Sequence, residues 1–152
     1  MLIVEYLDKP GFEKAINKHG QSDPYTVKHG KDGDAGYDLA AAYNDYQIAP
    51  GASVTIACGV KFNIPDGQYM RVVMRSGHGF KQDLSCHIGT IDSGYREEVF
   101  VRVRNHSKQY HTIKRGERFA QFILQRYESP AVQEGIVLPD TERGLTGLGS
   151  TG

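Results

Sequence analysis

Short apolar runs separated by glycine and proline predict a chain built from short strands. Four such runs lie between residues 47 and 74, at 47–48, 53–57, 60–64 and 69–74. Pro50-Gly51 and Pro65-Asp66-Gly67 stand between them, and these residues are typical of turns between strands. This rhythm favours a β-meander.

A strand is predicted at Val99 to Arg104, where apolar residues alternate with Arg102 and Arg104. A period of two is typical of a half-buried strand. Further strands are predicted at residues 2–7 and, as a hairpin, at 110–113 and 118–127. Helix is expected only at residues 12–18, inside the polar, glycine-rich segment 9–34.

These elements predict an all-β protein with a jelly-roll or β-barrel-like subunit. A length of 152 residues fits one domain, which we expect to consist of a β core at residues 1–140 and a flexible carboxyl-terminal arm at 141–152. The arm is glycine-rich and needs a partner to become ordered.

Charge and composition exclude several classes of protein. The chain has 18 Lys+Arg and 18 Asp+Glu, so it lacks the basic surface of a duplex-binding protein, and we expect no nucleic-acid partner. It shows no export signal and no apolar run long enough to cross a membrane. Cys58 and Cys86 have neither zinc-site nor disulfide spacing, so we expect reduced thiols in a cytoplasmic protein.

Two clusters place charged groups beside small residues. The segment 34–41, Asp-Ala-Gly-Tyr-Asp-Leu-Ala-Ala, offers Asp38 as a hard oxygen ligand, although it also fits a solvated aspartate at a turn. A later strand runs into Arg75, Ser76 and Gly77, a guanidinium, a hydroxyl and an accessible amide that suit a phosphate. A solvated arginine at a strand end fits the same residues.

The third cluster, Gly-Thr-Ile-Asp-Ser-Gly-Tyr-Arg at residues 89–96, combines an aspartate with a tight turn. Ile91 gives Asp92 a partly apolar setting, and the Ser93-Gly94 turn returns Tyr95 to the same neighbourhood. An ionised carboxylate can accept a proton from a water held for in-line attack on phosphorus. The alternative is an aspartate that binds its own turn amides.

Two further clusters lie near the carboxyl end. In Gly-Glu-Arg-Phe-Ala-Gln-Phe, residues 116–122, Gln121 is a neutral amide inside a strand, where it needs a ligand or a neighbouring strand as partner. Residues 143–152 begin with arginine, are rich in glycine and contain a Ser-Thr pair near the end. Such a segment can wrap a polyphosphate with backbone N–H groups and order when the ligand arrives, whereas a plain linker is the alternative.

The five clusters, in this order, resemble the five motifs of the trimeric dUTPase family. The match extends from Asp34 to Gly152, and five spaced motifs are far more specific than one. The resemblance implies a homotrimer with three active sites, each assembled from all three subunits. It also implies Mg²⁺-dependent hydrolysis of dUTP to dUMP and pyrophosphate by water attack on the α-phosphate, which limits uracil in DNA and supplies dUMP for thymidylate synthesis.

The resemblance also implies roles for single residues. Asp92 would be the general base, and the Tyr95 ring would pack beneath deoxyribose and exclude a 2′-hydroxyl. Asp38 matches a position near Mg²⁺ that acts through a water. Backbone groups that would pair with the uracil edge and select against other bases belong to Gly89, Thr90 and Ile91. The other substrate-binding positions are Arg75, Ser76, Gly77, Gln121, Arg143, Leu148, Gly149, Ser150 and Thr151.

The sequence departs from the family pattern at two positions near the base. Leu148 stands where the family usually has an aromatic ring that stacks on uracil, so the arm would close less tightly or another ring, for which Phe80 is the candidate, would substitute. Cys86 stands where some members place an amide that touches the base. Uracil recognition would then rest on the backbone.

Two other functions fit parts of the sequence. A dCTP deaminase shares this fold but needs a glutamate in the strand after the third cluster, and residues 101–104 contain no carboxylate. A dUTPase-like module could instead engage a regulatory protein through residues 9–33. His78, His87, His106 and His111 lack the spacing of a zinc site.

Overall fold

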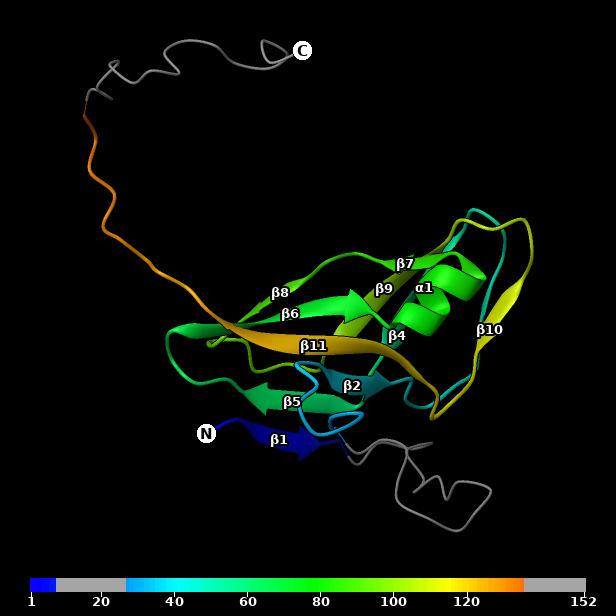
Figure 1. The fold of residues 1–152 in the computed structure, drawn as a ribbon, viewed down its shortest axis with the longest axis horizontal. Coiled ribbons are helices and arrows are strands. Elements are labelled where there is room, and N and C mark those ends of the chain that lie inside the picture. Colours follow the sequence, from blue (N-terminus) through cyan, green and yellow to red (C-terminus); the bar gives the residue numbers. More distant parts are fainter. Residues whose placement is uncertain (8–26, 136–152) are drawn as a thin grey trace.

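The computed structural model describes residues 1–7 and 27–135 (Figure 1). The helix predicted at 12–18, most of the segment 9–33 and the arm predicted at 141–152 lie outside the described residues. The same holds for five predicted substrate-binding residues: Arg143, Leu148, Gly149, Ser150 and Thr151.

Short strands dominate the described chain, with one helix among them. In chain order they are β1 (Ile3–Tyr6), β2 (Tyr37–Ala40), β3 (Tyr46–Ile48), β4 (Ser53–Ala57), β5 (Val60–Asn63), β6 (Gln68–Met74), α1 (Ser76–Gln82), β7 (Leu84–Cys86), β8 (Thr90–Asp92), β9 (Phe100–Asn105), β10 (His111–Ile113) and β11 (Arg118–Arg126). The all-β prediction is confirmed.

The strands form two main layers, with the three-stranded sheet behind the four-stranded one in Figure 1. The four-stranded sheet has the order β2-β11-β6-β8 and the three-stranded sheet the order β4-β9-β7, while β1 pairs with β5 and β10 with β3. Every pairing between described strands is antiparallel. Strands distant in sequence therefore lie side by side, as in a jelly roll.

This topology corrects two predictions. The strands between residues 46 and 74 are not a meander, because β4 pairs with β9, β5 with β1 and β6 with β11. The two strands predicted as a hairpin at 110–127 do not pair with each other, since β10 joins β3 and β11 joins β2 and β6. The turn residues in the sequence indicated where strands end, but they did not indicate which strands pair with each other.

The core lies between the layers and follows the alternation of strand side chains. Along β9, Val101 and Val103 point inward whereas Arg102 and Arg104 point outward, as predicted. On the opposite sheet Phe119 and Phe122 of β11 are fully buried. These apolar contacts stabilise both sheets and fix the register on which the positions of outward side chains depend.

Helix α1 was not predicted, because Ser76–Gln82 contains two glycines and has low helix propensity. It begins after Arg75 and ends at Asp83, which adopts a left-handed conformation with φ 52° and donates its N–H to the His78 carbonyl. The buried His78 ring contacts Glu117 at 2.9 Å and so ties the helix to the turn before β11.

The two cysteines are free thiols, as predicted. Burial raises the pKa of the Cys58 thiol, and the nearby Glu98 charge raises it further. Burial also raises the pKa of Cys86. Both thiols are therefore protonated and weakly nucleophilic at neutral pH.

Beyond β11, residues 127–135 leave the body as an extended, exposed segment (Figure 1). Val132 is 96% exposed, so this apolar side chain lacks a packing partner within the described chain. No helix among residues 1–7 and 27–135 is long and apolar enough to span a membrane.

Candidate active site

Three of the predicted clusters meet at one end of the four-stranded sheet. They enclose a cavity of about 370 Å³, which we call the Arg75 pocket, lined by Gly30, Asp34, Ala35, Gly36, Asp38, Arg75, Ser76, Gln121 and Ile123. The long-range pairings of β11 with β2 and β6 bring these residues together. Arg75, Ser76 and Gln121 were predicted as phosphate-binding positions and Asp38 as a position near the metal, and all four residues line this pocket.

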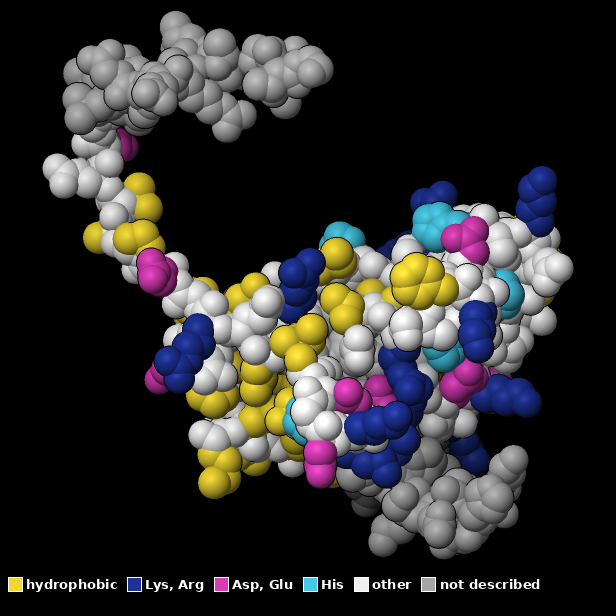
Figure 2. Space-filling model, viewed as in Figure 1, with side chains coloured by type: hydrophobic (Ala, Val, Ile, Leu, Met, Phe, Trp, Pro, Cys, Tyr) yellow, Lys and Arg dark blue, Asp and Glu magenta, His cyan; other side chains and the backbone are white. Residues whose placement is uncertain are grey.

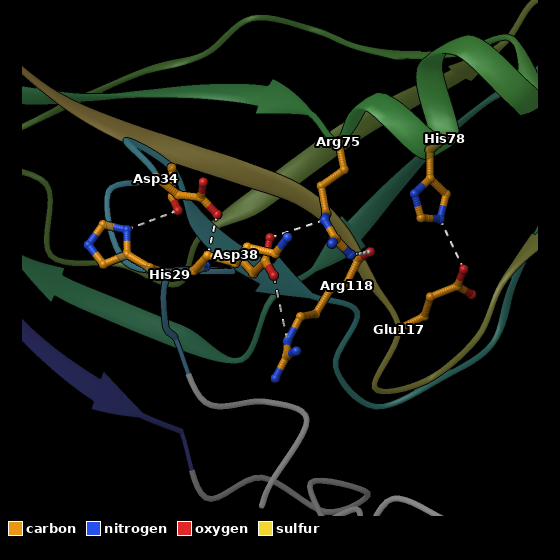
Figure 3. A network of polar contacts seen from close by, with 9 residues as sticks. His29, Asp34, Asp38, Arg75, His78, Glu117 and Arg118 are labelled. Carbon is orange, nitrogen blue, oxygen red and sulfur yellow. Dashed lines mark hydrogen bonds and ion pairs between the residues drawn. The ribbon is translucent and has the colours of Figure 1, made fainter.

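Arg75 is fixed in place by two contacts (Figure 3). Its Nε lies 3.1 Å from Oδ1 of Asp38, and its NH1 donates to the Arg118 carbonyl at 2.9 Å. The Asp38 side chain is only 7% exposed, whereas that of Arg75 is 40% exposed. A buried carboxylate therefore orients a guanidinium that still reaches solvent, where it can meet an anion.

Arg118 also belongs to the site, although the sequence did not single it out within the cluster at 116–122. Its Nε lies 3.9 Å from Oδ2 of Asp38, is buried, and has no hydrogen-bond partner among the described residues. Figure 2 shows Lys and Arg side chains gathered near acidic ones over this end of β2 and β11. The only sequence signal for Arg118 was its place within the cluster at 116–122.

Gly36 and Gln121 face each other across the pocket. A Cβ at position 36 would lie 2.5 Å from Oε1 and 2.9 Å from Cδ of Gln121. Residue 36 must therefore lack a side chain if the Gln121 amide is to keep its place. This close approach gives a physical reason for the glycine in the first cluster.

The described residues provide no preformed metal cage. No group of three or more His, Cys, Asp and Glu side chains within residues 1–7 and 27–135 could hold a metal ion. Both oxygens of Asp38 face guanidinium groups, which does not fit direct coordination of Mg²⁺. Asp34 lines the same pocket and accepts the Lys31 N–H at 2.8 Å. A role of Asp38 toward a metal is thus limited to one through water.

A second cavity of about 270 Å³ surrounds the third cluster. This Asp92 pocket is lined by Gly89, Thr90, Ile91, Asp92, Tyr95, Val99 and Phe100. Tyr95 donates its N–H to the Asp92 carbonyl at 3.1 Å, which closes the predicted Ser93-Gly94 turn. Arg96 steadies the turn, since its NH1 donates to the carbonyls of Ser93 and Tyr95.

Glu98 supports the Asp92 pocket from inside. Its carbonyl accepts the Tyr95 hydroxyl at 2.8 Å, and its buried carboxylate accepts the Gly59 N–H at 3.0 Å. Burial raises the pKa of the neighbouring Tyr43 phenol, and a hydrogen bond to Glu98 raises it further. The Glu98 side chain is engaged in the core and does not line the pocket, which disfavours its use as a deaminase base.

The aromatic residues of the Asp92 pocket are Tyr95 and Phe100, which are 38% and 53% exposed. Phe80, the candidate for stacking on uracil, lies on α1, is 93% exposed and lines neither pocket of its own chain. Phe100 was missed because an apolar residue in a strand resembles a core residue. Its outward direction is set by the buried neighbours Val99 and Val101.

The two pockets stand far apart within one chain. Asp92 pairs with Tyr69 near the start of β6, and Arg75 follows the end of that strand. Six steps of about 3.3 Å each along the strand lead from Tyr69 to Arg75, so Asp92 and Arg75 are about 20 Å apart. One chain therefore does not bring the predicted base and the predicted phosphate ligands together.

Comparison with known proteins agrees with the resemblance. The sequence profile of the dUTPase family matches residues 25–152. The deoxyuridine 5′-triphosphate nucleotidohydrolase of Mus musculus is 42% identical over 118 residues, 78% of this chain and 72% of the mouse protein. That of Paramecium bursaria Chlorella virus 1 is 35% identical over 127 residues, 84% of this chain and 89% of the viral protein.

A solved structure of a Staphylococcus phage 80alpha dUTPase variant has the same fold, with a TM-score of 0.79 at 23% identity over 99% of this chain and 98% of that chain. This likeness concerns the fold alone. Together with the family profile and the curated relatives, it leads to one conclusion. The chain belongs to the dUTPase family.

Proposed function

We propose that this protein hydrolyses dUTP to dUMP and pyrophosphate, which limits uracil in DNA and supplies dUMP for thymidylate synthesis. The observation that carries the proposal is the pair of complementary half-sites on one sheet. The Arg75 pocket offers oriented cationic and amide groups, and the Asp92 pocket offers a carboxylate beside a ring and an open backbone edge.

In this proposal the Arg75 pocket binds the triphosphate. Arg75 donates charge-assisted hydrogen bonds to phosphate oxygens, while Ser76 and Gln121 add a hydroxyl and an amide donor. Asp38 holds the Arg75 guanidinium in the required direction through its 3.1 Å contact. Gly77 is the second residue of α1, beside these groups, and a Cβ there would meet nothing within 4 Å, which leaves its backbone accessible to the phosphates.

The Asp92 pocket is proposed to bind the nucleoside and activate water. Because β8 is the edge strand of its sheet, one side of Gly89, Thr90 and Ile91 is free of strand pairing among the described residues and can pair with a uracil edge. The Tyr95 ring would pack beneath deoxyribose. Asp92 would take a proton from the water that attacks the α-phosphate.

Because Asp92 and Arg75 lie about 20 Å apart in one chain, we infer that neighbouring chains complete each site. A homotrimer would place the Asp92 pocket of one chain against the Arg75 pocket of the next, and residues 141–152 would close the site as a separate arm on the 1–140 core. Arg143, Leu148, Gly149, Ser150 and Thr151 would contact the substrate from that arm.

We infer that Mg²⁺ arrives with the triphosphate and keeps most of its waters, as this ion usually does. The donor set fits this indirect mode, because Asp38 is engaged by two arginines and can only contact the ion through water. When bound, the ion would neutralise part of the phosphate charge. Orientation and proton transfer remain the work of Arg75, Gln121 and Asp92.

Pyrophosphate release from each deoxynucleoside triphosphate tests the proposal. We expect release from dUTP, and little from dCTP or dTTP. Asp92→Asn should bind dUTP but hydrolyse it about 10²- to 10⁴-fold more slowly, because the amide cannot accept the proton. Asp66→Asn, at an exposed turn, is the matched control and should retain full turnover. Ammonia release from dCTP, or near-normal turnover by Asp92→Asn, would contradict the assignment.

A further inference from the structure

We propose that His78 is a positioning residue for the triphosphate, which holds Ser76 and Gly77 in place through its contact with Glu117. The inference deepens and rests on the proposed function, since it takes the Arg75 pocket as the phosphate site and adds what fixes one side of it. The His78 ring is buried, and its Nε2 lies 2.9 Å from Oε1 of Glu117 (Figure 3). Because a carboxylate only accepts hydrogen bonds, the ring donates to it through Nε2.

Helix α1 has little stability of its own. It consists of seven residues, two of which are glycine, and the side chain of its N-cap residue Arg75 makes no capping hydrogen bond. Helices this short are not stable alone in water, because few internal hydrogen bonds offset the cost of ordering the chain. Among the residues of α1, all of which the structure describes, His78 is the only buried one. The place of α1 on the protein therefore depends largely on this ring.

Glu117 offers the ring a fixed acceptor. Its second carboxylate oxygen, Oε2, accepts the Lys114 N–H at 2.9 Å, and its own N–H donates to the Lys114 carbonyl at 2.9 Å. The Glu117 carbonyl accepts the N–H of Ala41, the residue after β2, at 3.0 Å. The contact with His78 thus joins α1 to the turn before β11 and, through this turn, to the end of β2. Both strands carry other residues of the Arg75 pocket.

Arg75 and the two residues after it are held in different ways. Arg75 is bound directly to β11, because its N–H donates to the Phe119 carbonyl at 3.1 Å. Ser76 and Gly77 make no hydrogen bond to β11 within the described part of the chain. They lie between Arg75, whose carbonyl accepts the His78 N–H at 3.1 Å, and the anchored His78 ring. Loss of the ring contact should therefore release the Ser76 hydroxyl and the Gly77 amide while Arg75 stays in place.

This arrangement predicts an effect on phosphate binding and none on the base or sugar. The lining of the Asp92 pocket includes no residue of α1, and that pocket lies about 20 Å from Arg75. Removing a ring that only stabilised the fold would change the binding of nucleoside and nucleotide alike. Removing a positioning ring should weaken the nucleotide alone.

Enzyme kinetics of the full-length His78→Leu protein test the inference, because leucine fills a similar volume without a donor. We expect the Michaelis constant for dUTP and the dissociation constant of its imido analogue to rise about 3- to 10-fold, the effect of one lost hydrogen bond, with turnover changed less than about twofold. The inhibition constant of deoxyuridine, which has no phosphate, should stay unchanged. His78→Gln restores a donor and should recover most of the affinity for dUTP. Gln82→Ala, on the same helix but lining neither pocket, is the matched control and should behave as the unmodified protein does.

A second substitution links the effect to the partner of the ring. Glu117→Ala alone should show the same selective loss of affinity for dUTP, so the test stands even if His78→Leu does not fold. In the Glu117→Ala background, His78→Leu should raise the Michaelis constant no further, since the contact is already lost.

Several outcomes would overturn the inference. These are additive effects of the two substitutions, equal weakening of deoxyuridine, and a His78→Gln protein as impaired as His78→Leu. Failure of the proposed function is recognised separately, because the unmodified protein would then release no pyrophosphate from dUTP. Normal release with an unchanged Michaelis constant in His78→Leu would overturn this inference alone.

Discussion

The Arg75 pocket and the Asp92 pocket lie on the same sheet but are built in opposite ways. Around Arg75, side chains fix one another: a buried carboxylate faces two guanidinium groups, and Gly36 makes room for Gln121. Around Asp92, the backbone shapes most of the pocket, through an edge strand and a turn closed by the Tyr95 N–H. The first pocket holds charge, whereas the second presents shape and hydrogen-bonding groups.

This difference suggests how a protein of zero formal charge can bind a triphosphate. Cationic groups gather at one place and are held there by Asp38. In the proposed site the base and sugar require little charge, so an edge strand with a tyrosine would be enough to bind them. Because the two kinds of pocket stand about 20 Å apart on one chain, each can be altered separately, and in the proposed homotrimer neighbouring chains would complete each site.

The largest expected effect comes from mixing two inactive variants. Asp92→Asn disables one pocket and Arg75→Ala the other, so each homotrimer should be inactive. After equal amounts are unfolded and reassembled together, random trimers should regain about a quarter of the normal dUTP turnover, because three-quarters of them are mixed and each mixed trimer contains one intact composite site out of three. Mixing Asp92→Asn with itself is the control. No recovery despite mixed assembly would place both residues in a site within one chain.

Removal of residues 143–152 should have the next largest effect. The predicted arm would supply Arg143 and hydroxyl groups to the phosphates, so its loss should lower dUTP turnover at least about tenfold. The trimer should remain assembled by light scattering, because neither described pocket contains these residues. A truncated protein with normal turnover would refute the arm.

A smaller effect is expected from Asp38→Asn, which weakens the hold on Arg75. The Michaelis constant for dUTP should rise about 3- to 10-fold with a smaller change in turnover, and the free energy of unfolding should fall by about 1–3 kcal/mol. Asp34→Asn is the control, because an asparagine oxygen can still accept the Lys31 N–H. If excess Mg²⁺ restored Asp38→Asn fully, a role toward the metal would replace the orienting role.

The smallest effect should come from Gly36→Ala. Its Cβ would displace the flexible Gln121 side chain, which lies 2.5 Å away at its nearest atom, so we expect a Michaelis constant raised a few-fold with little loss of stability. Gly79→Ala is the control, since its Cβ would make an ordinary 3.8 Å contact. In a Gln121→Ala background, Gly36→Ala should have no further effect on dUTP binding, and an additive effect would contradict this explanation.

Sequence reasoning predicted the strands better than their pairing. Most strands between residues 46 and 126 were predicted within two residues of their ends, because side-chain alternation and turn residues are local signals. The partners of β4, β6 and β11 were not, since they depend on long-range packing. Helix α1 was missed because its two glycines give it a low helix propensity. The contact between His78 and Glu117, which is distant in sequence, stabilises it.

In the candidate site, too, local features were predictable from the sequence and long-range contacts were not. Motif resemblance predicted Arg75, Ser76 and Gln121 as phosphate ligands and Asp38 as a position near the metal, and these residues line one pocket. That Asp38 contacts Arg75 and Arg118 was not predictable, because nothing local reveals which guanidinium a carboxylate will face. Phe100 was missed although the predicted alternation places it on the outward face of β9 with Arg102 and Arg104, because an apolar residue in a strand resembles a core residue.

The length of β6 sets the distance between the Asp92 pocket and the Arg75 pocket. Because side chains alternate faces along a strand, inserting one residue between Tyr69 and Arg75 would turn the following side chains toward the core, whereas inserting two would preserve their direction and shift the ends apart by about 7 Å. Relatives that change this strand should therefore do so in pairs of residues, with a matching displacement of one subunit against the next.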